Sequence, residues 1–164
     1  MVLWLEVHRC LTALRPACTR TATFLWMSLV LVGFLIRPDL AGVTSFVRAG
    51  WLHEKAYRRL LHLFHTPALR LDTLTRLWIH LSLTLFQPVT AGSRRVLIAD
   101  GLKVPKEGRK MPAVKSLHTE SGNNSKPPYI MGHSFQALSL LVRGGRGAVL
   151  AVPLVSRIHE GILF

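Results

Sequence analysis

Residues 94–134 read RRVLIADGLKVPKEGRKMPAVKSLHTESGNNSKPPYIMGHS and decide which fold the chain can form. The stretch opens with a short run rich in Val, Leu and Ile, which predicts a buried strand over residues 95–99. This run ends on a single acid, Asp100, and Gly101 follows it. The Gly and Pro residues after that point predict a long basic loop over residues 101–128. An acid at the end of a buried strand, facing a basic loop, is suited to holding a metal ion beside a phosphate backbone.

Two further strands follow this loop. Residues 129–142 read as a strand, and the double glycine in residues 143–146 predicts a hairpin turn. Residues 147–155 return as a third strand, in which Pro153 indicates an edge or a bulge. The pattern predicts a meander of three antiparallel strands, with Asp100 on the first.

The chain before residue 87 has a helical pattern. Apolar residues recur at helical spacing within residues 53–65 and 67–86. Residues 2–14 read as an earlier helix, and Thr19 or Thr21 is the candidate cap of a second one that carries residues 24–36. Pro88 and Gly92 end the helical pattern. The sequence therefore predicts an α+β protein, with a helical bundle in residues 1–92 and a sheet in residues 93–164.

An apolar run, FLWMSLVLVGFLI, covers residues 24–36 and permits two interpretations. A membrane span needs about 20 apolar residues, and this run has 13 before Arg37. A helix that is apolar on all sides is otherwise one surrounded by protein. Because the run is short, we expect a buried helix and no membrane partner.

The composition points to a polyanionic partner. The 164 residues include 21 Lys and Arg against 8 Asp and Glu, which gives a formal charge of +13 and a pI of about 11.3. Such an excess favours nucleic acid or an anionic membrane surface as partner. A hydrophobic fraction of 49% argues against a disordered basic tail. Cys10 and Cys18 match neither a disulfide framework nor a zinc motif, so we expect reduced thiols in a cytoplasmic protein.

Several motifs of the second half resemble bacterial insertion-sequence transposases with a ribonuclease-H-like catalytic domain of the DDE type. The residues that carry the resemblance are Asp100-Gly-Leu-Lys-Val-Pro-Lys-Glu-Gly-Arg-Lys-Met-Pro112, Ser116-Leu-His118, Ser121, Asn124-Ser-Lys126, Tyr129-Ile-Met-Gly-His-Ser134, Val152-Pro-Leu154 and Arg157-Ile-His-Glu-Gly161. Upstream, Gly42-Val-Thr-Ser-Phe-Val-Arg48 resembles the helical DNA-binding part that precedes that domain. The resemblance covers about residues 24–161, and its most specific part is residues 100–112.

The resemblance implies a function in DNA transposition. Enzymes of this family hold two Mg²⁺ ions with three carboxylates, cut a DNA strand and join it to a target. By position, Asp100 corresponds to the first carboxylate and is the candidate catalytic and metal-binding residue. The second acid and the final Glu lie beyond a third strand in this family and are absent here. The resemblance thus implies an N-terminal fragment: a DNA-binding helical region and the first three strands of an incomplete catalytic domain, with strand cleavage confined to the complete enzyme.

The candidate DNA-binding residues are cations of the same stretch and one histidine: Lys103, Lys106, Arg109, Lys110, Lys115 and His133. Five cations against one acid, Glu107, within 13 residues favour phosphate contacts over an ordinary solvated loop. Each candidate has a plainer interpretation. Asp100 before Gly101 is also a common turn dipeptide, and His133 is also consistent with a hydrogen-bonded histidine of the sheet. His62 and His65 are expected on an exposed helix face.

Three functions remain open on this sequence. The first is a truncated transposase that binds transposon ends and target DNA at the nucleoid, alone or with the full-length enzyme. The second is a non-catalytic basic DNA-binding protein. The third is a small membrane-anchored protein with a basic domain.

Overall fold

The computed structural model describes residues 2–37, 42–106, 111–118 and 128–159. The described residues form five α-helices and antiparallel sheets, so the predicted α+β class is confirmed. The chain divides into two compact units, Met1–Leu81 and Ser82–Phe164, and the division falls within the last helix.

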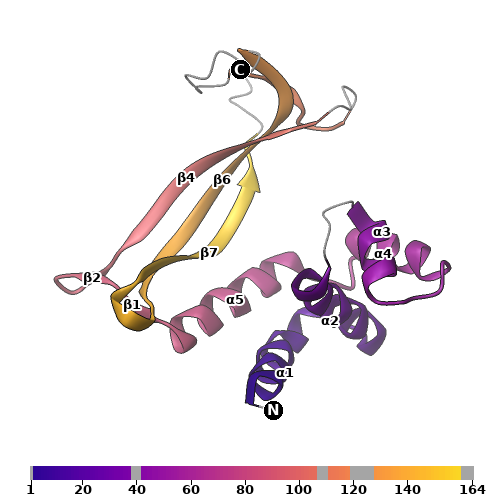
Figure 1. Cartoon of the computed structure of the whole chain (residues 1–164), viewed down its shortest axis with the longest axis horizontal. Coiled ribbons are helices and arrows are strands. Elements are labelled where there is room, and N and C mark those ends of the chain that lie inside the picture. Colours follow the sequence, from indigo (N-terminus) through magenta and orange to yellow (C-terminus); the bar gives the residue numbers. More distant parts are fainter. Residues whose placement is uncertain (1, 38–41, 107–110, 119–127, 160–164) are drawn as a thin grey trace. The chain divides into compact units, whose positions relative to one another are not determined.

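The first unit is helical (Figure 1). Its helices are α1 (Val2–Leu14), α2 (Thr21–Ile36), α3 (Gly42–Ala49), α4 (Ala56–His65) and α5 (Leu71–Leu85), with a short 3₁₀ turn at Arg15–Ala17. Pro16 cannot donate a helical hydrogen bond, and α1 passes into the 3₁₀ turn at this point. The turn positions Arg70, whose backbone N–H donates to the Ala17 carbonyl at 2.9 Å. This bond ties the start of α5 to the link between α1 and α2.

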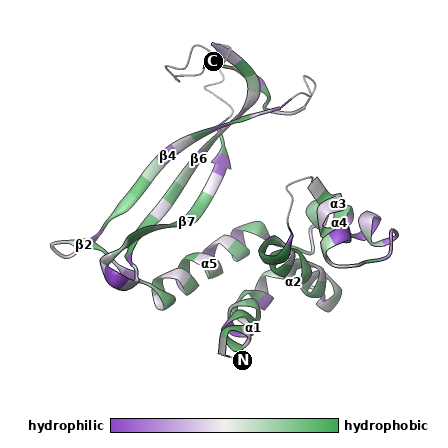
Figure 2. Cartoon of the chain, viewed as in Figure 1, coloured by the Kyte–Doolittle hydropathy of each residue, from purple (hydrophilic) through white to green (hydrophobic). Residues whose placement is uncertain are grey.

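Helix α2 contains the apolar run of the sequence, and it is buried on one side only. One stripe, formed by Thr23, Met27, Val30 and Gly33, is buried, whereas Leu25, Phe34, Leu35 and Ile36 are exposed. Figure 2 shows apolar residues along almost the whole of α2. The prediction that this helix is surrounded by protein is therefore wrong, because the neighbouring helices cover a single stripe. Among the described residues, no helix is both long enough and apolar enough to cross a membrane.

Helix α2 separates two small apolar clusters. Val30 packs with Phe46 of α3 and with Leu60 and Leu63 of α4. Met27 packs with Leu14 and Cys18, and helix α5 contributes half-buried side chains to this second cluster. The faces of α2 and α4 that point away from these clusters are left for solvent or a ligand.

The second unit is built on three long antiparallel strands, β4 (Leu97–Pro105), β6 (Tyr129–Arg143) and β7 (Val149–Ile158). Strand β6 lies between the other two, as the predicted meander requires (Figure 1). Short strands β1 (Gln87–Pro88) and β5 (Lys115–His118) extend the pairing along β6, and β2 (Thr90–Ala91) pairs with β3 (Arg94–Arg95). The predicted irregularity at Pro153 is confirmed, because the β6–β7 register shifts between Leu138 and Ser139, where Ser139 pairs with Pro153.

The first strand is longer than predicted. Instead of ending at Asp100, β4 continues to Pro105, and Gly101 pairs with Gln136 of β6. Strand β5 occupies another part of the segment predicted to be loop. The prediction failed because Gly101 was taken as a turn residue, whereas pairing with β6 keeps it extended. The predicted burial of this strand is also wrong, since all its residues except Val104 are exposed.

Candidate nucleic-acid interface

Asp100 lies in the middle of β4, paired with Ala137 of β6. Its side chain is exposed, and Oδ1 accepts a hydrogen bond from the Gly101 N–H at 2.7 Å. A carboxylate in this position is open to solvent on a regular strand. The expected position at the end of a buried strand is therefore corrected to an exposed position within it.

Asp100 and the nearest cation point to opposite faces of the sheet. Side chains alternate along a strand, so Asp100 shares a face with Ile98 and Leu102, and Lys103 lies on the other face. Asp100 was expected to face the basic stretch, and in this register it does not face Lys103. Within the described part of the chain, no group of three or more His, Cys, Asp or Glu side chains is placed to hold a metal ion. Asp100 is thus a single carboxylate, which alone binds Mg²⁺ weakly.

The face opposite Asp100 gathers three cations near one end of the sheet. The register places Lys103, Lys115 and Arg157 on this face, because they pair with Ser134, Gly132 and Gln136 of β6. Lys103 reaches across the sheet, and its Nζ donates to the His118 carbonyl at 2.7 Å. Lys106 follows β4 and is exposed. Arg109 and Lys110, the other two predicted cations, lie outside the described residues.

His133 is held inside the sheet. Its side chain is only 6% exposed, and Nε2 lies 2.9 Å from the Pro112 carbonyl oxygen. At that distance the ring donates a hydrogen bond and fixes the segment before β5 against β6. This geometry favours a structural histidine over a phosphate contact.

The helical unit has a second group of cations, around two adjoining hollows between α2 and α4. The hollows have volumes of about 310 and 320 Å³ and share the side chains of Trp26 and Arg59. We name them the Trp26 hollows. The first hollow, of about 310 Å³, is lined by the charged or titratable residues Arg20, Arg58, Arg59 and His62. The second, of about 320 Å³, is lined by His53, Lys55 and Arg59.

The amphipathic pattern of α4 explains why these cations gather there. Leu60 and Leu63 are buried against α2 and α3, so Arg58, Arg59 and His62 are left exposed. No Asp or Glu side chain lines either hollow. Within the described residues, the guanidinium groups of Arg20, Arg58 and Arg59 make no ion pair or hydrogen bond. Several positive charges without internal partners, on a concave surface, attract an anion.

Sequence reasoning did not single out these cations. The sequence does indicate part of this group. Two pairs on one predicted helix are spaced four residues apart, which places each pair on one helix face: Lys55 with Arg59, and Arg58 with His62. Arg20 and Trp26 come from a different helix, and only the packing of α2 on α4 brings them to the same hollow. His62 was expected on an exposed helix face, and it is exposed.

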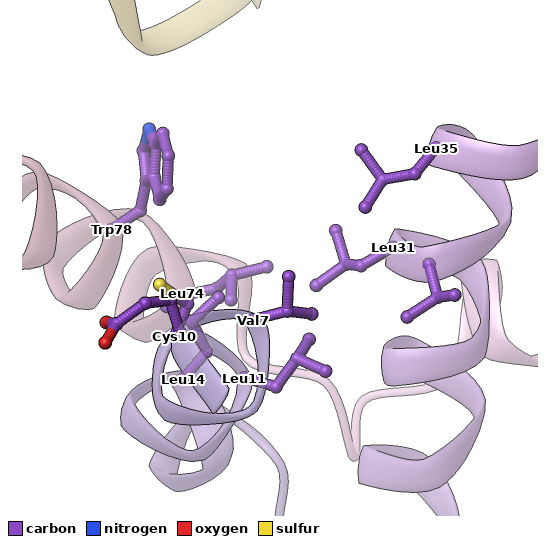
Figure 3. A pocket seen from close by; sticks show the side chains of 10 residues that line it. Val7, Cys10, Leu11, Leu14, Leu31, Leu35, Leu74 and Trp78 are labelled. Carbon is purple, nitrogen blue, oxygen red and sulfur yellow. The ribbon is translucent and has the colours of Figure 1, made fainter. Parts of the chain in front are cut away.

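A third concave surface in the helical unit is apolar. A groove of about 530 Å³ lies between α1, α2 and α5. Figure 3 shows Leu31 and Leu35 on one side of it, and Val7, Leu11 and Trp78 on the other. Cys10 also lines the groove, and Cys18 lies in the adjacent core, where burial raises the pKa of its thiol despite the opposing effect of Arg15. Both thiols are free, as expected, and the groove offers little polar chemistry.

No protein-family model matches this chain, and neither a curated protein nor a solved structure is significantly similar to it. The function therefore has to be argued from the charge and the geometry of the chain itself.

Proposed function

We propose that this chain binds DNA as the N-terminal part of a DDE-type transposase, whose complete form cuts and joins DNA strands. The observation that carries DNA binding is the set of unpaired cations at the Trp26 hollows, in a chain with a formal charge of +13. Arginine suits this role because its planar guanidinium matches the geometry of a phosphate group. Such contacts hold a DNA backbone in place without reading its sequence.

Two features support the transposase part of the proposal. The first is the sequence resemblance centred on residues 100–112. The second is the antiparallel order of β4, β6 and β7, with Asp100 on β4, which supports the proposal because a ribonuclease-H-like domain opens with three antiparallel strands. Asp100 would be one of the three carboxylates of that domain.

Strand cleavage is not proposed for this chain. Two-metal phosphoryl transfer needs oxygen ligands that hold both ions beside the attacking and leaving oxygens. The described residues supply one such carboxylate, so they do not fit a two-metal site. We propose that Mg²⁺ acts in the complete enzyme only, and that this chain binds DNA alone or together with the full-length protein.

The salt dependence of DNA affinity tests the proposal. Each phosphate contact to duplex DNA contributes about −0.9 to the slope of log K against log salt. Four contacts, one for each Arg and Lys at the Trp26 hollows, predict a slope of about −3.6, or a loss of about 150-fold between 50 and 200 mM NaCl. Fluorescence anisotropy with a labelled 20-base-pair duplex measures both values. A flat salt response, or no binding at 50 mM NaCl, would overturn DNA binding.

A parallel titration with anionic vesicles separates DNA from a membrane surface. The exposed apolar side chains Phe34, Leu35 and Ile36 at the end of α2 are the observation that favours the membrane alternative. Vesicles of phosphatidylcholine with phosphatidylserine should bind more weakly than DNA at equal anion concentration and equal salt. Tighter binding to these vesicles would favour the membrane-anchored basic protein instead.

A further inference from the structure

We infer that the Trp26 hollows bind an unpaired nucleobase with its flanking phosphates, so that the protein prefers single-stranded to duplex DNA. The inference rests on the proposed DNA binding and adds the form of DNA that the site takes. Two observations carry it: an aromatic side chain shared by both hollows, and cations that line the same hollows.

Trp26 provides a stacking surface that is already held in place. The indole is half-buried, packs against the cluster of Val30, Phe46, Leu60 and Leu63, and also lines both hollows. Because the core fixes the ring, little side-chain entropy is lost when a ligand packs on it. Bases stack on such aromatic side chains without regard to sequence, since every base has a π-face.

The surrounding cations fit the backbone of the same strand. Arg20 stands before α2, and Arg58 and Arg59 lie on α4, so positive charge reaches the first hollow from two helices. Lys55 and Arg59 continue the charge along the second hollow. A positively charged hollow that also contains an aromatic side chain is the arrangement typical of proteins that bind single-stranded nucleic acid.

A duplex would use only part of this surface. Bases in a duplex are stacked and paired, so they cannot enter a hollow unless they are first extruded at a cost of a few kcal/mol. A duplex therefore reaches the arginine groups through its phosphates and leaves the indole without a partner. A free inorganic anion would likewise contact the arginines alone. The Trp26 indole therefore adds to the affinity for a single strand, but not to the affinity for a duplex or for an inorganic anion.

The first test compares Trp26→Leu with a matched control, Trp51→Leu. Trp51 is 95% exposed and lines neither hollow. Wild-type protein should bind a 20-nucleotide dT strand about tenfold or more tightly than a duplex of the same length, as base stacking contributes on this scale. Trp26→Leu should remove this preference and leave duplex affinity within about twofold, and Trp51→Leu should change neither. Circular dichroism checks that each variant is folded.

The second test does not alter the core. Arg58 and Arg59 are exposed, so the double variant Arg58→Gln/Arg59→Gln should fold. Each lost contact to a single strand lowers the magnitude of the salt slope by about 0.7, which predicts a fall of about 1.4. The control Arg76→Gln removes an exposed cation of α5 that lies outside the hollows, and should leave the slope unchanged.

The outcomes separate this inference from the proposed function. Equal affinity for dT strand and duplex in wild-type protein, or a slope that Arg58→Gln/Arg59→Gln does not change, overturns the inference while DNA binding stands. Absence of salt-dependent binding to either form of DNA overturns both. Binding of inorganic phosphate that competes fully with the dT strand at millimolar concentration would show an anion site in place of a base site.

Discussion

Gly132 of β6 lies against the backbone of β4, without room for a side chain. A Cβ atom added there would overlap the Val104 carbonyl oxygen and would lie 3.1 Å from the Pro105 Cα. Both neighbours are backbone atoms of a paired strand, so they cannot rotate away as a side chain can. We expect Gly132→Ala to lower the free energy of unfolding by about 1–3 kcal/mol, as in other overpacked sites. Urea unfolding followed by circular dichroism measures this change.

Gly145 provides the matched control for this substitution. A Cβ atom there meets nothing within 4 Å, and its φ is not in the left-handed region. Gly145→Ala should therefore stay within about 0.5 kcal/mol of the wild-type protein, as surface substitutions usually do. Equal effects of the two substitutions would mean that the close approach of β4 to Gly132 is not present in solution.

At the scale of single residues, the sequence named candidate residues but did not indicate on which face of the sheet each one lies. Asp100 and Lys103 were identified as neighbours in the chain, but strand alternation sends them to opposite faces once β4 extends past Gly101. His133 was given two interpretations, and its bond to the Pro112 carbonyl favours the structural one. Both outcomes depend on pairing with distant residues, which no local pattern encodes.

At the scale of elements, the contact of α2 with α3 depends on the absence of a side chain at Gly33. A Cβ atom there would lie 2.6 Å from Cδ1 of Phe46. The Phe46 ring is held by an edge-to-face contact with Phe34 at 5.0 Å and by Arg37, whose guanidinium lies 4.5 Å from its centre. Alanine favours a helix over glycine by up to about 1 kcal/mol, but displacing a buried ring costs about 1–3 kcal/mol. We expect Gly33→Ala to be destabilising, as measured by thermal and urea unfolding.

A double-mutant cycle with Phe46→Leu identifies the cause. In the Phe46→Leu background the contact is relieved, so Gly33→Ala should become neutral or stabilising by up to about 1 kcal/mol. If Gly33→Ala has the same effect in both backgrounds, the contact of Gly33 with Phe46 does not limit the packing of α2 on α3.

At the scale of elements, the ends of the helices were predicted more closely than their burial or the extent of the first strand. The predicted helix at residues 2–14 has the bounds of α1, and the helix predicted to carry residues 24–36 ends where α2 ends. Helix α2 has no apolar period, so the sequence could not indicate which stripe would be buried. The continuation of β4 beyond Gly101 depends on pairing with a distant segment, residues 132–135. The Trp26 hollows likewise depend on the packing of two helices.

At the scale of the whole molecule, net charge and exposed apolar surface have opposite effects on the association of two copies of the chain. Strand β4 pairs only with β6 among the described residues, so its other edge is open along nine residues. Leu97, Ile98 and Leu102 are exposed on this strand. An open, apolar edge favours pairing with a second copy, whereas a charge of +13 opposes it. The balance should depend on ionic strength.

This balance predicts that self-association and DNA binding respond to salt in opposite directions. Screening shortens the range of repulsion between copies, with a Debye length of about 10 Å at 0.1 M, so sedimentation velocity should show more dimer at 300 than at 50 mM NaCl. Leu102→Lys adds a cation to the edge strand, where the native side chain is 60% exposed, and should reduce the dimer at both salt concentrations. Trp51→Lys adds the same charge at a residue of the helical unit that is 95% exposed, and should have a smaller effect. Equal effects of the two lysines would assign the change to net charge alone, and the β4 edge would then have no part in association.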